Sequence, residues 1–228
     1  MKTIGLIGGM SWESSAHYYR IINEEVRSAL GGSHSASILM YSYDFHEIER
    51  LQRAGEWEAM RRSLFDVGRR LKAGGADFAV LCTNTMHKVM DGFEDEAGLP
   101  LLHIVDVAGE ALSSFDIKRI GLLGTRFTME ETFYRERLER GFDIEVLVPD
   151  AAGRAAVDGI IFGELVRGIV SDESRKVYES IMDGLVARGA DAILLGCTEI
   201  GLLVKDYSAP VFDTTPLHAR RAARLSLE

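Results

Sequence analysis

The sequence predicts an α/β protein made of two similar lobes, each a parallel sheet flanked by helices. Short apolar runs alternate with longer helical segments along the chain, which is typical of parallel sheets covered on both faces. The stretches Gly75–Met86 and Gly189–Ile200 also share an opening Gly-Ala-Asp and continue through an apolar strand into a polar turn. They lie half of the 228-residue chain apart, so they predict two related halves.

Capping residues and glycines place the helices of the first half. Ser11 is a helix N-cap, Gly31-Gly32 ends that helix, and Gly55 divides a later helical stretch into two pieces. These signals and the apolar runs between them predict an alternating order of elements. We expect strands at 3–7, 37–43, 78–82 and 101–104, and helices at 12–30, 45–73 and 84–97.

The second half repeats this order. The run Ile120–Gly124 echoes Ile4–Gly8 and leads through Thr128 into a helix. Further strands are expected at 144–148, 193–195 and 211–212, and further helices near 155–169, 174–188 and 216–227. We therefore expect a first lobe of residues 1–103 plus 210–228 and a second lobe of residues 104–209. The repeat predicts that pseudo-two-fold symmetry relates the lobes, with the site in the cleft between them.

Composition limits the classes of function. The formal net charge of −9 argues against nonspecific binding of nucleic acid, which needs a basic surface. The sequence has no signal-peptide pattern and no apolar run long enough to cross a membrane, so we expect a cytoplasmic protein without a membrane partner. The two cysteines do not form a disulfide framework, and the six histidines show no metal-ligand spacing, so we expect no metal.

Polar and small residues follow four of the expected strands. They are Gly8–Met10, Thr83–Thr85, Gly124-Thr125 and Cys197–Glu199. Ligands of parallel sheets bind at the carboxyl ends of the strands, where helix N-termini offer free backbone N–H groups. The four loops therefore favour a site for a small anion with more than one carboxylate. The alternative is that small residues at these positions only allow tight turns.

Cys197 is the candidate reactive group. A thiol with a reference pKa near ~8.5 is partly thiolate at neutral pH, and more so where helix N-termini stabilise the anion. A nucleophilic hydrolase usually adds a histidine as base, and no histidine neighbours Cys197 in sequence. Two proton-bearing groups on opposite faces of one carbon would instead invert that carbon. Thr83 would be the second group, and its hydroxyl is a poor base.

The chain resembles the cofactor-independent aspartate/glutamate racemases. The resemblance rests on Gly8-Gly9-Met10-Ser11-Trp12, on Thr83-Asn84-Thr85-Met86-His87 and on Gly196-Cys197-Thr198-Glu199. It implies that a pair of residues, here Thr83 and Cys197, works on opposite faces of Cα. The family carries cysteine at both positions, and the resemblance is to the subgroup that acts on L-aspartate and L-glutamate. Strand alternation turns Cys82 to the opposite face from Thr83, so Cys82 is not its substitute.

The four strand-end loops, and for Gln52 the resemblance, give a set of expected substrate-binding residues. These are Met10, Gln52, Asn84, Thr85, Thr125, Thr198 and Glu199. Alternatives stay open for several of them. Met10 and its glycines could serve only turn and packing, Gln52 could lie on a solvated helix face, and Glu199 could cap its own helix instead of binding the substrate ammonium. His87 could equally be a hydrogen-bonded structural histidine.

The expected function is racemisation of aspartate or glutamate, favouring L-substrates, by removal and return of the Cα proton. The resemblance implies no cofactor, because preorganised donors would stabilise the carbanion-like transition state. One alternative is a single-cysteine decarboxylase or isomerase of the same superfamily. Another is a non-catalytic sensor of acidic amino acids, which the thiol of Cys197 disfavours. We expect a homodimer, since two-fold dimers are the commonest oligomers.

Overall fold

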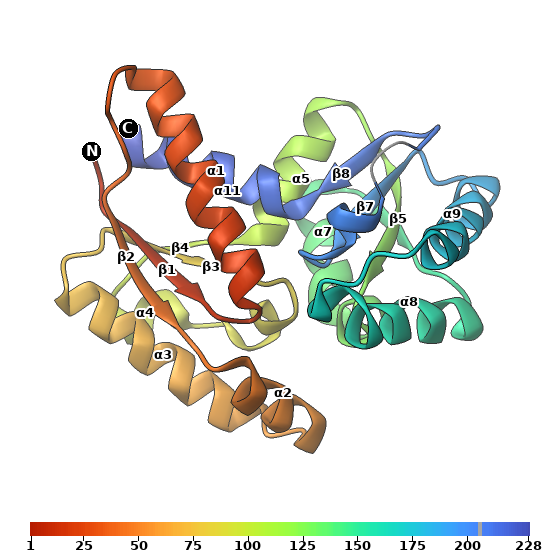
Figure 1. Cartoon of the computed structure of the whole chain (residues 1–228), viewed down its shortest axis with the longest axis horizontal. Helices are drawn as coiled ribbons and strands as arrows, with labels where there is room; N and C mark the ends of the chain where they lie inside the picture. The colour runs from red at the N-terminus through yellow and green to blue at the C-terminus, as the bar shows by residue number, and fades with distance from the viewer. Residues whose placement is uncertain (205–206) are drawn as a thin grey trace. The chain divides into compact units, whose positions relative to one another are not determined.

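The chain forms two compact units, each a four-stranded parallel sheet flanked by helices (Figure 1). In this computed structural model the described residues are 1–204 and 207–228. The first unit comprises Met1–Ile104 and His218–Glu228, and the second comprises Val105–Leu217. The strand orders β2-β1-β3-β4 and β6-β5-β7-β8 correspond strand for strand. The predicted repeat of two α/β halves is therefore confirmed.

The elements of the first unit follow the predicted order. They are β1 (Ile4–Gly8), α1 (Trp12–Leu30), β2 (Ile38–Ser42), α2 (Phe45–Ala54), α3 (Trp57–Ala73), β3 (Phe78–Leu81), the 3₁₀ helix η1 (Thr85–Val89), α4 (Phe93–Ala97) and β4 (Leu101–Leu102). The Ser11 side chain accepts the Ser14 N–H as a helix N-cap, and Gly31 ends α1 with a φ of 75°. Gly55 ends α2 in the left-handed region. These three helix boundaries are as expected.

One helix of the first unit differs from the expectation. Residues 84–97 form the short 3₁₀ helix η1 and then α4, where a single helix was predicted. Gly92 lies between the two at a φ of +77°, a value that an α-helix cannot accommodate. The strand expected at 101–104 is also shorter, because α5 (Ile104–Ser114) begins directly after Leu102 and His103.

The two faces of the first sheet bury different helices. Ile4, Phe78, Val80 and Cys82 pack with α1 and with α11 (Thr214–Leu227) in one core cluster. On the other face, Ile7, Ala79 and Leu81 pack with α2, α3 and α4. This alternation places Cys82 on the face opposite to that of Leu81, as the period of a strand requires.

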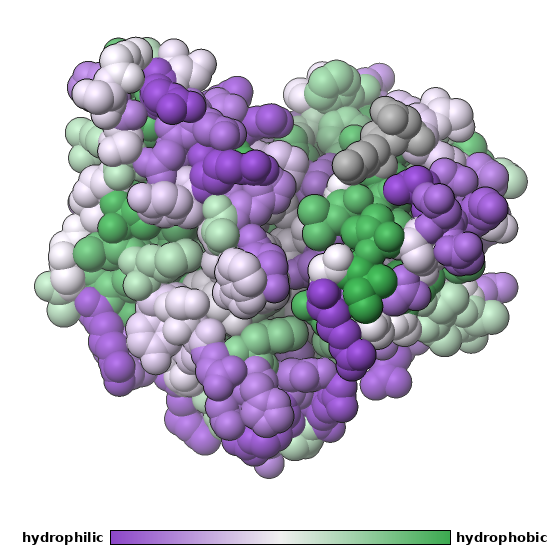
Figure 2. Space-filling view, viewed as in Figure 1, coloured by the Kyte–Doolittle hydropathy of each residue, from purple (hydrophilic) through white to green (hydrophobic). Residues whose placement is uncertain are grey.

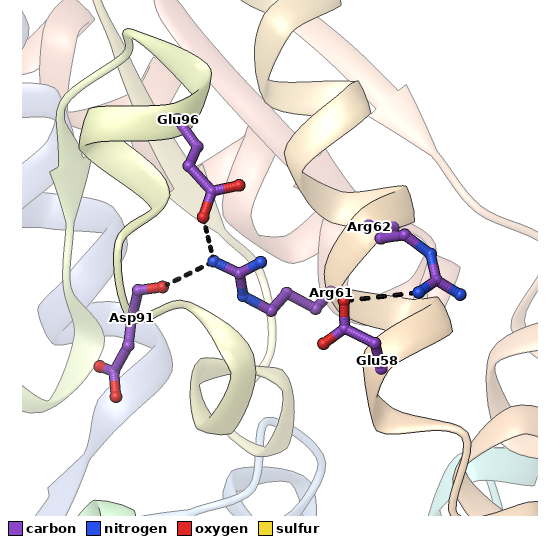
Figure 3. A network of polar contacts seen from close by, with 5 residues as sticks. All are labelled: Glu58, Arg61, Arg62, Asp91 and Glu96. Carbon is purple, nitrogen blue, oxygen red and sulfur yellow. Dashed lines mark hydrogen bonds and ion pairs between the residues drawn. The ribbon is translucent and has the colours of Figure 1, made fainter.

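Arg61 links α3 to the segment that follows η1 (Figure 3). Its guanidinium donates to the Asp91 carbonyl at 3.4 Å and pairs with Glu96 of α4. The same guanidinium lies over the Phe65 ring, 4.1 Å from its centroid, and Phe65 meets Phe93 edge to face. These contacts hold α4 and the residue Asp91 before it against α3.

The second unit has the same topology. Its elements are α5, β5 (Arg119–Gly124), α6 (Arg126–Glu130), α7 (Thr132–Phe142), β6 (Glu145–Leu147), α8 (Ala151–Gly163), η2 (Leu165–Arg167), α9 (Asp172–Ala187), β7 (Ala192–Gly196), α10 (Ile200–Leu203), β8 (Val211–Asp213) and the first turn of α11. Strand β8 pairs with β7 through Ile193↔Val211 and Leu194↔Phe212. The segment 210–217 therefore lies in the second unit, whereas the sequence analysis assigned 210–228 to the first lobe.

The core of the second unit surrounds the carboxyl end of β7. Leu195 and Cys197 pack with residues of α8 and α9 in one cluster. Helices α5 and α7 pack on each other where a Cβ on Gly109 would lie 2.4 Å from the Phe142 ring, so glycine is required there.

Figure 2 shows polar and apolar residues interspersed over the visible face. In the described part of the chain, no helix has the length and apolar character needed to span a membrane.

Candidate active site

The nine predicted site residues follow the carboxyl ends of strands or lie on α2, and all are buried. The first unit holds Met10, Gln52, Thr83, Asn84 and Thr85, and the second holds Thr125, Cys197, Thr198 and Glu199. The strand-end positions come from β1, β3, β5 and β7. Each unit therefore gathers its own polar group at the end of its two central strands.

The loop after β1 is fixed by Ser15, a residue that the sequence analysis did not single out. Ser15 Oγ accepts the Gly9 N–H at 2.8 Å and donates to the Ser11 carbonyl at 2.8 Å. Gly9 has a φ of +84°, and a Cβ there would come within 2.2 Å of the Tyr43 carbonyl oxygen. These contacts support a turn-and-packing role for the glycines, and Ser15 already engages the Gly9 N–H.

Met10 and Gln52 both contact the interior of the first unit. Met10 is 5% exposed and belongs to the core cluster under α2, α3 and α4. Gln52 is 8% exposed, and its Nε2 donates to Met86 Sδ at 3.2 Å. A solvated helix face is therefore wrong for Gln52. Its side chain reaches η1, the element that begins at Thr85.

The strand end at Thr83 is held by its backbone. The Thr83 N–H donates to the Leu81 carbonyl at 2.9 Å, and the Thr83 carbonyl accepts from His87 Nδ1 at 2.8 Å. Cys82 is fully buried in the cluster on the opposite face, where burial raises the pKa of its thiol. Cys82 is thus an inert core thiol. The expectation that it does not replace Thr83 agrees with this packing.

His87 is integrated into the backbone of the first unit. Besides the bond from its Nδ1 to Thr83, its Nε2 lies 3.3 Å from the Ile104 N–H. The side chain is 2% exposed. Two hydrogen bonds to backbone groups support the structural alternative for His87.

In the second unit the thiol is hydrogen-bonded to a carboxylate. Cys197 Sγ donates to Glu199 Oε2 at 3.1 Å, and Thr198 Oγ1 donates to the same oxygen at 2.7 Å. Burial, followed by the charge of Glu199, raises the pKa of Cys197 well above its usual value. The sequence analysis considered a thiolate stabilised by helix N-termini. Here α10 has only four residues and the thiol is a protonated donor.

The alternative of a capping role for Glu199 is wrong. Glu199 is the N-cap residue of α10, but its side chain makes no capping hydrogen bond. Its carboxylate instead accepts from Cys197 and Thr198. The negative charge of this buried carboxylate favours a cation nearby.

Asp213 is a further acid that the sequence analysis missed. A Cβ on Gly201 would lie 2.2 Å from Asp213 Oδ2, so glycine in α10 makes room for this carboxylate. The charge of Asp213 contributes to the raised pKa of Cys197. Asp213 ends β8, so the strand-end argument applied to the fourth strand of this sheet would have identified it.

Thr125 has a capping role in the structure. Its Oγ1 accepts the Thr128 N–H at 3.4 Å and lies 3.3 Å from the Thr128 hydroxyl at the start of α6. Its predicted contact with substrate stays a prediction. Within residues 1–204 and 207–228, no group of three or more His, Cys, Asp or Glu side chains is arranged to hold a metal ion.

Comparison with known proteins assigns the chain to a family. Residues 7–222 match the family model described as Asp/Glu/Hydantoin racemase. The chain belongs to this family. A Yersinia pestis protein assigned as an Asp/Glu racemase has a solved structure that is 52% identical, with a TM-score of 0.93 over 100% of both chains.

Two curated relatives extend the comparison. A broad specificity amino-acid racemase of Bacillus subtilis (strain 168), RacX, is 22% identical over 223 residues, which are 95% of each chain. A glutamate racemase of Aquifex pyrophilus is 27% identical over 160 residues, and the match spans 59% of that relative's length. The family match and the two relatives that align over nearly their full length identify this chain as an amino-acid racemase.

Proposed function

We propose that the protein racemises aspartate or glutamate by moving the Cα proton through Cys197, without a cofactor. The observation that carries this proposal is the buried Cys197 thiol at the carboxyl end of β7, hydrogen-bonded to Glu199. A cysteine can remove a proton from carbon only in its thiolate form. In the substrate-free protein the negative charge of Glu199 disfavours the thiolate. Substrate binding therefore has to neutralise this charge.

The substrate ammonium group supplies the required change. Glu199 and Asp213 make the surroundings of Cys197 acidic, which favours a cation next to the thiol. An ammonium group that pairs with Glu199 neutralises the nearest negative charge, and the pKa of Cys197 then falls. The thiolate would form only when an amino acid is bound, which limits unproductive reactions of the free thiol.

The remaining polar residues hold the carboxylates of the substrate. Asn84 and Thr85 follow β3, and Thr198 follows Cys197. Their side chains and backbone N–H groups are of the kind that bind carboxylates and stabilise the charge that develops on the Cα carboxylate when the proton leaves. Two carboxylates on one small molecule match aspartate and glutamate. The family description, which names both amino acids, supports the same substrate class.

Handedness follows from the unequal chemistry of Cys197 and Thr83. In the family that the sequence resembles, the second-half cysteine faces the L-enantiomer. The Thr83 hydroxyl is a poor base, so abstraction from a D-substrate would start slowly. The protein should consume L-substrates faster than D-substrates without changing the equilibrium constant.

The test is a screen of L- and D-amino acids in heavy water, measuring deuterium uptake at Cα and optical inversion. We expect activity with aspartate, glutamate or both, and loss of exchange in a folded Cys197→Ser variant because a hydroxyl is far less acidic than a thiol. Cys82→Ala is the matched control and should keep its exchange. The proposal fails if no acidic amino acid exchanges, or if Cys197→Ser exchanges at the wild-type rate.

A further inference from the structure

Two histidines hold the short segment Leu102–Ile104 from both sides. The Leu102 carbonyl accepts a hydrogen bond from His218 Nε2 at 2.9 Å. The Ile104 N–H donates to His87 Nε2 at 3.3 Å. Between these residues the ring of His103 meets the ring of His87 at a centroid distance of 4.5 Å. An imidazole ring is thus the partner of both the Leu102 carbonyl and the Ile104 N–H.

The partners of His87 fix its protonation. A carbonyl oxygen can only accept, so the bond to Thr83 places a proton on Nδ1. A backbone N–H can only donate, so the bond from Ile104 requires a free lone pair on Nε2. The neutral tautomer with its proton on Nδ1 alone satisfies both partners. His87 thereby joins the Thr83 carbonyl to the backbone of Ile104.

His218 supports the same segment from α11. Its Nε2 donates to Leu102, so its Nδ1 accepts from the Tyr18 hydroxyl at 3.0 Å. The ring is fully buried, and burial lowers the pKa of His218 to about 4. The ring is neutral at neutral pH, which matches its two hydrogen bonds.

The supported segment is where the chain passes from one unit to the other. The first unit ends at Ile104 and resumes at His218. His87 and His218 thus bind the backbone next to the point where the chain leaves the first unit. His218 is also the first residue after the chain returns to that unit. His87 belongs to the turn that follows β3, and its Nδ1 contact is to Thr83 itself.

We propose that His87 is a positioning residue for the reaction, which holds the Thr83 backbone against Ile104 so that the Thr83 hydroxyl is correctly placed at Cα. This inference rests on the proposed function. His87 acts through the Thr83 carbonyl, and the support of Leu102 by His218 keeps the Ile104 end of the connection in place. Displacement of a reacting group by about 1 Å can cost roughly 100-fold in rate.

This role predicts an unequal effect on the two faces of Cα. Cys197 removes the proton of the L-substrate, and solvent exchange on that face needs only the thiol. Inversion also needs proton delivery from the Thr83 face. A displaced Thr83 should therefore leave deuterium uptake into the L-substrate largely intact while inversion falls. A loss of general stability would lower both rates together.

The experiment compares inversion with exchange for L-substrate in heavy water, using variants verified as folded by circular dichroism. His87→Leu removes both hydrogen bonds, whereas the side-chain amide of His87→Asn can still donate to Thr83. The exposed His34 provides the control His34→Leu. We expect the ratio of inversion to exchange to fall at least about tenfold in His87→Leu, to recover most of its value in His87→Asn, and to stay unchanged in His34→Leu.

The outcomes separate this inference from the function on which it rests. A wild-type ratio in folded His87→Leu overturns the positioning role and leaves the proposed function standing. If His87→Leu does not fold, His87→Gln replaces it. The longer glutamine side chain places its amide near the position of Nε2 and so away from the Thr83 carbonyl. A ratio in His87→Asn no higher than that in His87→Gln then overturns the inference. A wild type that shows no exchange, or exchange without inversion, contradicts the proposed chemistry and this inference with it.

Discussion

Cys197 Sγ lies 3.1 Å from Glu199 Oε2 and donates a hydrogen bond to it. The same oxygen accepts from Thr198 at 2.7 Å, in a setting where all three residues are buried. A negative charge next to a thiol disfavours the thiolate, so the protonation of Cys197 depends on what neutralises Glu199. Under the proposed function, binding of the substrate ammonium group at Glu199 would therefore promote formation of the reactive thiolate.

Glu199→Gln should make Cys197 more reactive in the absence of substrate. The substitution removes the charge that, after burial, contributes most to the raised pKa of the thiol. The pKa should fall, so the rate of alkylation by iodoacetamide at a fixed pH should rise several-fold. Mass spectrometry of the modified peptides over a range of pH measures this at Cys197 separately from Cys82.

Glu173 is an exposed residue of α9, and Glu173→Gln is the control for the change of net charge. It should leave the alkylation profile of Cys197 unchanged. Cys82 should remain unmodified in every folded variant, because its thiol is fully buried. A Glu199→Gln protein whose Cys197 alkylates no faster than the wild type would show that the Glu199 charge does not control the pKa of Cys197.

His218 should make the fold sensitive to acid. Its pKa is about 4 in the folded chain, against 6.5 for the free side chain. The unfolded chain therefore takes up the proton first as the pH falls. The stabilisation is complete above pH 6.5 and is lost as the pH falls toward 4, where the loss amounts to about 3 kcal/mol.

Urea unfolding at pH 7.5, 5.5 and 4.5 measures this loss. Because carboxylates also titrate in this range, the informative quantity is the difference between the wild type and His218→Gln. The variant should be less stable at pH 7.5 and should lose less stability on acidification. If the free energies of unfolding of both proteins fell in parallel, His218 would not be the responsible group.

The repeat made the fold predictable from the sequence. The matching stretches around Asp77 and Asp191 identified β3 and β7, and glycines such as Gly31 and Gly55 set helix ends that the structure confirms. These are local signals, because a strand or a cap depends on neighbouring residues. The break at Gly92 was missed because the apolar pattern on either side of it reads as one continuous helix.

The contacts within the candidate site could not be predicted, because they depend on tertiary packing. Ser15 lies one helical turn into α1, yet its hydroxyl fixes the Gly9 N–H. Gln52 looks like a surface residue in its charged helix, but it reaches Met86. Asp213 approaches Gly201 from the end of β8, which pairs with β7 in the sheet. In each case a side chain meets a partner whose position is set by the fold.

The most direct measurement for the proposed chemistry is the initial rate of Cα deuterium uptake from L- and D-aspartate and from L- and D-glutamate in heavy water. Of Cys197 and Thr83, only the Cys197 thiol would form its anion near neutral pH, once the substrate ammonium group has neutralised Glu199. Uptake into the L-substrate should therefore be much faster than uptake into the D-substrate. Thr83→Cys should then raise the rate with the D-enantiomer more than that with the L-enantiomer. Equal initial rates from both enantiomers in the unmodified protein would contradict the roles given to Cys197 and Thr83.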